Sequence, residues 1–438
     1  MKQVIKQTIK IITLSSVFLI SNIAHATLNI QTWTTQNGSK VMYVHAPELA
    51  MVDIELKFDA GSARDKSKWG LASLTSNLLG TATQNMNEDQ ISEGFNSVGS
   101  QFSTGSGKDA ATVSLRSLTR PEILQQSLAM FTKVIAKPRF DKAIFKREVA
   151  RLILGLKQAK TKPSSIASKA MWHGLYGDHP YAHSSSGTLT TVKKITTKDL
   201  VEFYQTNYVS NNAQVSIVGN VDLAQAKAIA EQISSSLKKG QKPPVIPAVN
   251  SLTQAKSKQI EFSSSQTHYS LSQIGVERGN KDYVALFVGN HILGGSGFNS
   301  LLMEEIRSKR GLVYGVYSYF SAMKSAGPFI VRLSTKNSTA KEADSVVKQI
   351  LNDFLNDFPT EKLQAIKANL IGGFPLRMNS NSKILGYISM IGFYNLPLDY
   401  LESFPKAIEK TTKQDILTAW NKHIQPNKML TVMVGKPE

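Results

Sequence analysis

The stretch Asp199–Gly219, DLVEFYQTNYVSNNAQVSIVG, recurs without a gap 216 residues later as Asp415–Gly435, DILTAWNKHIQPNKMLTVMVG. Each copy has the pattern of an amphipathic helix, an Asn-containing turn and an alternating strand that ends in Val-Gly. Thr-rich stretches precede both copies, at Thr196-Thr197 and Thr411-Thr412, and predict helix N-caps. A period this long indicates two duplicated domains rather than a solenoid.

The correspondence extends upstream of these segments. Residues 97–136 and 312–351 each predict two strands followed by a helix, with Arg116 and Arg332 near equivalent strand ends. A stretch rich in Pro and Lys, residues 238–256, marks the boundary between the copies. We therefore predict an α+β fold of two homologous domains, each a mostly antiparallel sheet packed with helices. The expected division is an N-terminal domain at 27–240, a linker at 241–254 and a C-terminal domain at 255–438.

The N-terminus has the pattern of a secretory signal peptide. Three lysines occur in the first ten residues, an apolar run covers residues 11–20, and Ala24-His-Ala26 has the A-x-A spacing of a cleavage site. A membrane anchor is the alternative, but this run is too short to span a bilayer, and no later segment approaches the required length. We expect residues 1–26 to be removed and the mature chain to be exported, into the periplasm of a bacterium, without a transmembrane anchor.

Composition favours a globular protein over a nucleic-acid-binding one. Of the 438 residues, 41% are hydrophobic, and none is Cys, so disulfides and thiolate metal sites are excluded. Loss of the leader and its three lysines lowers the formal net charge from +19 to +16. The lysines are scattered rather than gathered in a basic stripe, which predicts a solvated basic surface and no nucleic-acid partner.

The stretch Trp69–Gly80, WGLASLTSNLLG, predicts a helix with a buried apolar face and an unusual second face. The leucines of this stretch fall at helical spacing. Ser73, Ser76 and Asn77 occupy positions i, i+3 and i+4 on another face. Two imidazoles and a carboxylate at that spacing would form a metal site, whereas this chain has two hydroxyls and an amide there.

The wider segment Gly61–Thr83, GSARDKSKWGLASLTSNLLGTAT, resembles the pitrilysin/insulinase family of zinc metallopeptidases. That family has a similar Gly-Ser turn and Gly-Leu-Ala helix start, followed by an H-x-x-E-H motif, and the resemblance covers nearly all of the mature chain. It puts Ser73 and Asn77 at the histidine positions and Ser76 at the catalytic glutamate.

The family takes its third zinc ligand from a later helix, in which one Glu precedes the ligand Glu by seven residues. In this chain FDKAIFKREVARLILGLKQ keeps the first as Glu148 but has Gly155 at the ligand position. Serine is a poor zinc ligand, an amide is neutral and glycine has no donor. The resemblance thus implies half of a clamshell whose metal site is degenerate, with no metal or other cofactor in this chain.

The second domain departs less from the family. A Gly-rich segment, residues 294–301, leads into EEIRSKRGLVYGVYSYFS, where Arg307 and Tyr314 match the family's R-x6-Y pair. In the family this pair holds substrate and stabilises the oxyanion, roles that suit a guanidinium and a phenol. The alternative is structural: Arg307 would cap a helix surface and Tyr314 would pack within a strand.

Three further motifs are interpreted as structural. His173, His179 and His183 lie around a His-Pro turn, which predicts a loop rather than a metal cluster. Residues 105–108, GSGK, lack the spacing of a phosphate loop and predict a hairpin turn. The glycines at 294–297 precede no nucleotide-binding pattern.

We expect a non-catalytic subunit of an exported zinc peptidase. It would be inactive alone and would pair as a heterodimer with a paralogue that has an intact H-x-x-E-H helix and carries the zinc. This chain would supply Arg307 and Tyr314 for hydrolysis of peptide substrates. A zinc-free homodimeric peptide-binding or scaffolding protein is the alternative. An autonomous zinc protease would need a relocated metal site.

Overall fold

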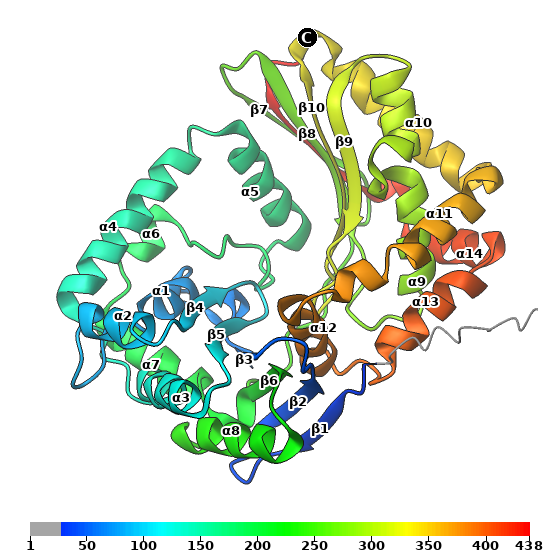
Figure 1. Cartoon of the computed structure of the whole chain (residues 1–438). Coiled ribbons are helices and arrows are strands. Elements are labelled where there is room, and N and C mark those ends of the chain that lie inside the picture. The colour runs from blue at the N-terminus through cyan, green and yellow to red at the C-terminus, as the bar shows by residue number, and fades with distance from the viewer. Residues whose placement is uncertain (1–27) are drawn as a thin grey trace, which may run out of the picture.

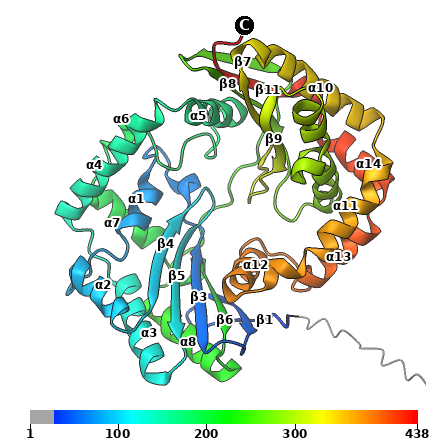
Figure 2. The ribbon, with the colours of Figure 1, turned by 45° about the horizontal axis from the view of Figure 1, so that its top comes forward.

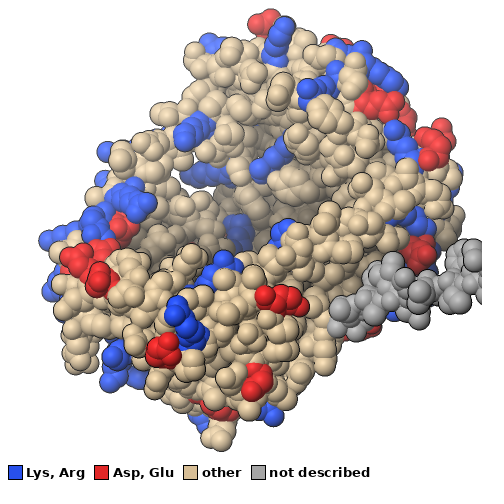
Figure 3. All heavy atoms as spheres, viewed as in Figure 1, with Lys and Arg blue, Asp and Glu red and all other residues tan. Residues whose placement is uncertain are grey.

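The computed structural model describes residues 28–438, so the predicted signal peptide lies outside the described residues. The chain forms two halves, each built on one β-sheet, and their ribbons curve around a centre that is hollowed in the space-filling view (Figure 1, Figure 2, Figure 3). The space-filling view shows this hollow, with basic side chains on its wall (Figure 3). We call the elements up to residue 236 the first half and those from residue 256 onward the second half.

The first half has a six-stranded sheet of order β1-β2-β6-β3-β5-β4. Only the β2–β6 pair is parallel. The strands are β1 (Gln31–Thr34), β2 (Lys40–His45), β3 (Met51–Phe58), β4 (Gln101–Ser106), β5 (Ala111–Leu118) and β6 (Ala213–Gly219). The helices are α1 (Leu71–Leu78), α2 (Glu88–Asn96), α3 (Pro121–Ala136), α4 (Lys142–Ala159), α5 (Pro163–Tyr176), α6 (Leu189–Val192), α7 (Thr197–Asn207) and α8 (Leu223–Ser236).

The second half has a five-stranded sheet of order β7-β11-β8-β10-β9, in which only the β7–β11 pair is parallel. Its strands are β7 (Lys256–Glu261), β8 (Gln266–Ile274), β9 (Val313–Phe320), β10 (Pro328–Lys336) and β11 (Leu430–Gly435). Its helices are α9 (Tyr283–Asn290), α10 (Ala340–Asn356), α11 (Thr360–Gly372), α12 (Asn381–Phe393), α13 (Tyr400–Lys410) and α14 (Lys413–His423). Apart from β1, the two sheets have one strand order, which confirms the predicted duplicated α+β fold.

The two copies of the sequence repeat adopt the same local structure. Helices α7 and α14 begin with capping boxes in which Thr196 and Thr412 each accept a hydrogen bond from the N–H three residues on. The predicted Thr N-caps are therefore confirmed. Strands β6 and β11 end at Gly219 and Gly435. A Cβ at Gly219 would lie 2.3 Å from a main-chain oxygen, and one at Gly435 would lie 2.5 Å from Thr267 Oγ1. Each terminal glycine is thus needed for a close approach of the neighbouring strand.

The halves exchange a helix. Helix α5 belongs to the first half in sequence, yet its apolar side chains pack on the second sheet, against strands β8 and β11. Helix α12 belongs to the second half and packs on strands β2, β3 and β6 of the first sheet. Each sheet therefore has its own helices on one face and the exchanged helix on the other (Figure 1). This exchange couples the two cores into one unit.

None of the helices between residues 28 and 438 combines the length and the apolar character that a bilayer-spanning segment requires.

Candidate functional site

Helix α1 carries the predicted degenerate metal motif, and its start is fixed by a buried carboxylate. Asp65 accepts hydrogen bonds of 2.7 Å from the N–H groups of Gly70 and Ala72. Burial raises the pKa of the Asp65 carboxyl, while these hydrogen bonds and His183 act in the opposite direction. Gly70 has φ of 100°, a left-handed conformation that favours glycine, which explains the Gly-Leu-Ala start of the helix.

The three motif positions on α1 face different surroundings. Ser73 is half-buried and Asn77 is exposed. Ser76 is 1% exposed, and its hydroxyl faces that of Tyr208, although neither atom has a partner of full hydrogen-bond geometry. The helix buries Leu71, Leu74, Leu78 and Leu79, as the sequence pattern predicted.

The position expected to supply the third ligand lies on α4, which packs beside α1. Gly155 is exposed, and a Cβ built there would have no atom within 4 Å. The retained Glu148 is half-buried and pairs with Arg147 at 3.1 Å and with Arg151 at 3.8 Å. Hydroxyls, an amide and a glycine do not make a zinc site. Within residues 28–438, no group of three His, Cys, Asp or Glu side chains is placed to hold a metal ion.

Arg307 and Tyr314 are brought together. Arg307 lies in a π-helical turn, Met303–Ser308, and Tyr314 lies in β9, which is the outermost strand of the second sheet. The Arg307 guanidinium is 4.8 Å from the centre of the Tyr314 ring and 4.6 Å from that of Phe298. Tyr314 is 87% exposed and Phe298 is 67% exposed. Tyr314 thus lies in a strand, as the structural alternative expects, but its side chain is on the surface and not in the core.

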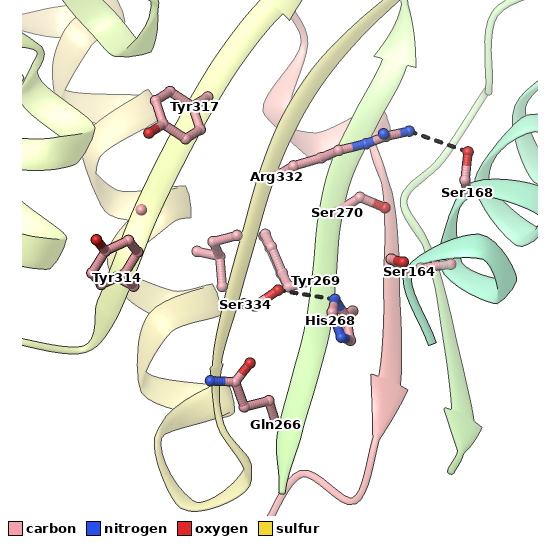
Figure 4. A pocket seen from close by; sticks show the side chains of 13 residues that line it. Ser164, Ser168, Gln266, His268, Tyr269, Ser270, Tyr314, Tyr317, Arg332 and Ser334 are labelled. Carbon is pink, nitrogen blue, oxygen red and sulfur yellow. Dashed lines mark hydrogen bonds between the residues drawn. The ribbon is translucent and has the colours of Figure 1, made fainter. Parts of the chain in front are cut away.

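Tyr314 also lines a cavity of about 580 Å³ between the second sheet and the exchanged helix α5 (Figure 4). Strands β8, β9 and β10 form its floor, and α5 forms one wall. Tyr314 and Tyr317 lie on the β9 side, while the Arg332 side chain extends toward α5 (Figure 4). The lining residues are Ser164, Ala167, Ser168, Gln266, His268, Tyr269, Ser270, Tyr314, Gly315, Tyr317, Arg332, Leu333 and Ser334.

Strand pairing shows how closely Arg116 and Arg332 correspond in position between the two sheets. In the first sheet, Arg116 is opposite Asp53, which is opposite Val218. The corresponding row of the second sheet runs from Val434 through His268 to Ser334. Arg332 thus lies two residues from the position that corresponds to Arg116.

A second cavity, of about 470 Å³, lies where the halves meet. Three of its cationic side chains have carboxylate partners: Arg64 and Lys324 share the Asp59 carboxylate, and Lys57 pairs with Glu55. Lys40, Lys242 and Arg278 also line this cavity, and none of them forms a salt bridge within residues 28–438. The lining of this cavity is therefore net basic, with part of its positive charge compensated by Asp59 and Glu55.

The other motifs have structural surroundings. His179 and His183 each place a ring nitrogen 2.9 Å from a main-chain oxygen, of Pro247 and Ser62 respectively, and His173 is exposed. Residues 107–110 join β4 to β5, which confirms the predicted hairpin, and Lys108 points inward to the carbonyl of His183 at 2.7 Å. The Gly-rich segment begins in the last two residues of a π-helical turn, His291–Gly295, and continues as a 3₁₀ turn at Gly297–Asn299.

Sequence reasoning missed the cavity and three of its side chains, Tyr317, His268 and Arg332. The R-x6-Y motif reaches β9 but ends at Tyr314, and it includes none of these three residues. The helix that covers them is 90 residues or more away in sequence. The sequence signal that could have indicated this cavity was the polarity of β8. Gln266, His268 and Ser270 occupy alternate positions, so three polar side chains share one face of a strand that is mostly buried.

Comparisons with known proteins agree with this geometry. A model described as insulinase (peptidase family M16) matches residues 40–189, and one described as the peptidase M16 inactive domain matches residues 194–370. A curated relative from Bacillus subtilis, "Uncharacterized zinc protease YmxG", is 23% identical over 81% of this chain and 86% of its own length. The "Non-peptidase homolog YmxG" of Helicobacter pylori is 24% identical over 90% of this chain and 91% of its own.

Among solved structures, a peptidase M16 inactive domain from Pseudomonas fluorescens is similar over 93% of this chain and 98% of its own length. The two are 38% identical and superpose with a TM-score of 0.90. Together with the duplicated sheets and the altered α1 motif, this similarity shows that the chain belongs to the insulinase (M16) family of peptidases, as a degenerate member.

Proposed function

We propose that this chain is the non-catalytic subunit of an exported, periplasmic peptidase. Its partner is a paralogue with an intact H-x-x-E-H helix, which supplies the zinc and the general base. This chain contributes Arg307 and Tyr314, whose side chains hold the peptide and donate hydrogen bonds to developing negative charge.

The observation that carries the proposal is the exposed stack of Phe298, Arg307 and Tyr314. A tyrosine ring that is 87% exposed contributes little to the core of its own chain. Stacking over two rings leaves the edge of the Arg307 guanidinium free to donate hydrogen bonds. Such an arrangement at the mouth of a cavity suits a surface that acts on a bound peptide.

The edge position of β9 supports peptide binding. Its only strand neighbour among residues 28–438 is β10. At its outer edge the Ser318 C=O accepts a hydrogen bond from Asn290 at 2.9 Å and the Val316 N–H points to Met303 Sδ at 3.4 Å, so the other outer N–H and C=O groups are the ones open to a further strand. An extended peptide can pair with such an edge by main-chain hydrogen bonds. Tyr314, Tyr317 and Tyr319 would then lie beside the bound peptide.

The test is peptide hydrolysis by the chain reconstituted with the paralogue of its own genome that carries the intact motif. We expect Arg307→Ala and Tyr314→Phe to leave the heterodimer assembled and to lower its turnover by about 10²–10³ if each removes an oxyanion donor. The matched controls are Arg310→Ala, which removes an arginine paired with Glu305, and Tyr400→Phe on helix α13, which does not line the cavity. Both controls should retain turnover.

Wild-type turnover in a stable heterodimer that carries both substitutions would refute the role of the pair. Stoichiometric zinc in the isolated chain, or chelator-sensitive hydrolysis by it, would refute the non-catalytic assignment. If the chain forms a homodimer that binds peptides and never associates with the paralogue, the zinc-free binding or scaffolding function replaces the proposal.

A further inference from the structure

Arg332 is half-buried, and no carboxylate of residues 28–438 pairs with it. One terminal nitrogen, Nη2, lies 3.4 Å from Ser168 Oγ and 3.8 Å from Met171 Sδ, both on α5 (Figure 4). A guanidinium has five N–H donors, and the remaining ones have no acceptor among residues 28–438. No Asp or Glu lines the cavity that Arg332 enters. A partly desolvated charge without a counter-ion costs free energy, which a ligand of opposite charge would recover.

The first sheet provides an internal comparison. On its face toward the exchanged helix α12, Arg116 forms a two-pronged ion pair with Asp53, at 2.6 and 2.8 Å. Lys57 on the same face lies 3.2 Å from Glu55. Arg116 and Lys57 therefore have carboxylates from their own sheet, while Lys40 on that face donates hydrogen bonds to the Gly392 carbonyl at 2.8 Å and to Asn395 Oδ1 at 3.0 Å. The matching face of the second sheet has Arg332 but neutral side chains beside it.

The groups around Arg332 are hydroxyls and one imidazole. Ser164 and Ser168 face the cavity from α5, Ser270 from β8 and Ser334 from β10. Burial lowers the pKa of His268, so its ring is neutral at neutral pH, and its Nδ1 lies 2.9 Å from Ser334 Oγ. Hydroxyl groups donate readily to carboxylate oxygens, and none of these neighbours repels an anion.

The cavity has room for part of a peptide. Its volume of about 580 Å³ exceeds that of one side chain, and Tyr314 and Tyr317 offer apolar faces along the β9 side. Tyr317 is directly opposite Arg332 in the sheet, so a chain passing over the tyrosines arrives next to the guanidinium.

We infer that this cavity binds a carboxylate of a peptide, with Arg332 as its counter-ion and the surrounding serines as further donors. The inference rests on the proposed peptide-binding role and adds a preference for acidic ligands. The carboxylate can come from an Asp or Glu side chain or from the C-terminus of the peptide. A planar guanidinium suits both because it can donate two parallel hydrogen bonds to either.

Fluorescence polarisation with the purified chain tests this inference. The probes are four fluorescein-labelled pools of decapeptides, randomised among uncharged residues. They differ only in a C-terminal acid or amide and in a central Glu or Gln. We expect one or both acidic features to tighten binding by about ten-fold, and Arg332→Gln to abolish that gain while binding of the fully neutral pool is unchanged. Arg332→Lys, which keeps the charge without the planar fork, should retain part of the gain.

Lys336→Gln is the matched control, because it removes one positive charge from an exposed position of the same strand outside the cavity. Equal binding of all four pools to the wild-type chain would overturn the inference and leave peptide binding intact. An equal effect of Lys336→Gln would also overturn it, since the preference would then reflect net charge. Failure of every pool to bind would count against the peptide-binding role itself. Thermal unfolding checks that each variant is folded.

Discussion

The hydroxyl of Tyr394, just after α12, lies 3.1 Å from the carboxylate of Asp109 in the β4–β5 hairpin and donates a hydrogen bond to it. Asp109 is buried, and it also accepts hydrogen bonds from the Tyr181 hydroxyl and from the N–H of Lys324 at 2.8 Å. Tyr394 and Lys324 belong to the second half, whereas Tyr181 belongs to the first. A single buried carboxylate therefore ties the two halves together.

Removal of the Tyr394 hydroxyl should lower the stability of the whole chain. We expect Tyr394→Phe to reduce the free energy of unfolding by about 1.5–3 kcal/mol, as for loss of a hydrogen bond to a charged group. Tyr400→Phe is the control, because the Tyr400 hydroxyl has no hydrogen-bond partner within residues 28–438. Urea unfolding followed by circular dichroism measures both changes. Equal effects of the two substitutions would show that the Asp109 contact is dispensable.

The contact between α12 and the first sheet predicts opposite effects for two glycines of one helix. A Cβ at Gly392 would lie 2.5 Å from Gln214 Oε1 and 2.7 Å from Met42 Cγ, while one at Gly386 would meet no atom within 4 Å. Gly392→Ala should therefore cost about 1–3 kcal/mol through overpacking. Gly386→Ala should stabilise the chain by about 0.5–1 kcal/mol through helix propensity. A stabilising Gly392→Ala, measured by the same unfolding titration, would contradict the packing of the exchanged helix.

The duplicated fold could be predicted because the repeat carries local signals. The Thr caps at 196 and 412 and the Val-Gly strand ends occur at the same spacing in both copies. The helix exchange could not be predicted. Apolar periodicity shows that α5 has a buried face, with Ala167 and Met171 on it, but it does not show which sheet that face covers.

The candidate site was predictable only in part. The R-x6-Y pattern identified Arg307 and Tyr314 as a pair. Their stacking with Phe298 depends on a turn that no sequence pattern specified. Arg332 was visible as one strand arginine among others. Its missing counter-ion depends on which residues of β8 face it and on the helix that closes the cavity, and both are long-range consequences of the fold.

Two positions of the degenerate metal motif, Gly155 and Ser76, should differ in how well they tolerate a glutamate. Gly155 is exposed with open space around it, so Gly155→Glu should change the free energy of unfolding by less than about 1 kcal/mol. Ser76 is buried against Tyr208, so Ser76→Glu should cost about 3–5 kcal/mol by placing an unpaired carboxylate in the core. Unfolding titrations at neutral pH compare the two. Ser76→Glu with wild-type stability would show that this position opens to solvent.

The Lys108 ammonium in the β4–β5 hairpin predicts a rise in stability at alkaline pH. It donates a hydrogen bond to the carbonyl of His183 at 2.7 Å and lies over the ring of Trp172. Desolvation lowers the pKa of Lys108 to about 8, against the opposing influence of Asp65 and Asp109. The folded chain therefore loses this proton near pH 8, whereas the unfolded chain keeps it until about pH 10.5.

Between these two values the unfolded state binds more protons, so stability should increase with pH. The increase expected from Lys108 alone is about 2 kcal/mol between pH 8 and pH 10. Above pH 10 the buried tyrosines act in the opposite direction, because burial raises the pKa of Tyr176 and the unfolded state deprotonates first. Urea unfolding at intervals of half a pH unit measures the slope. Lys108→Gln should remove the increase, while Lys133→Gln, at an exposed position of α3, should retain it. An unchanged slope in the Lys108 variant would assign the effect to other groups.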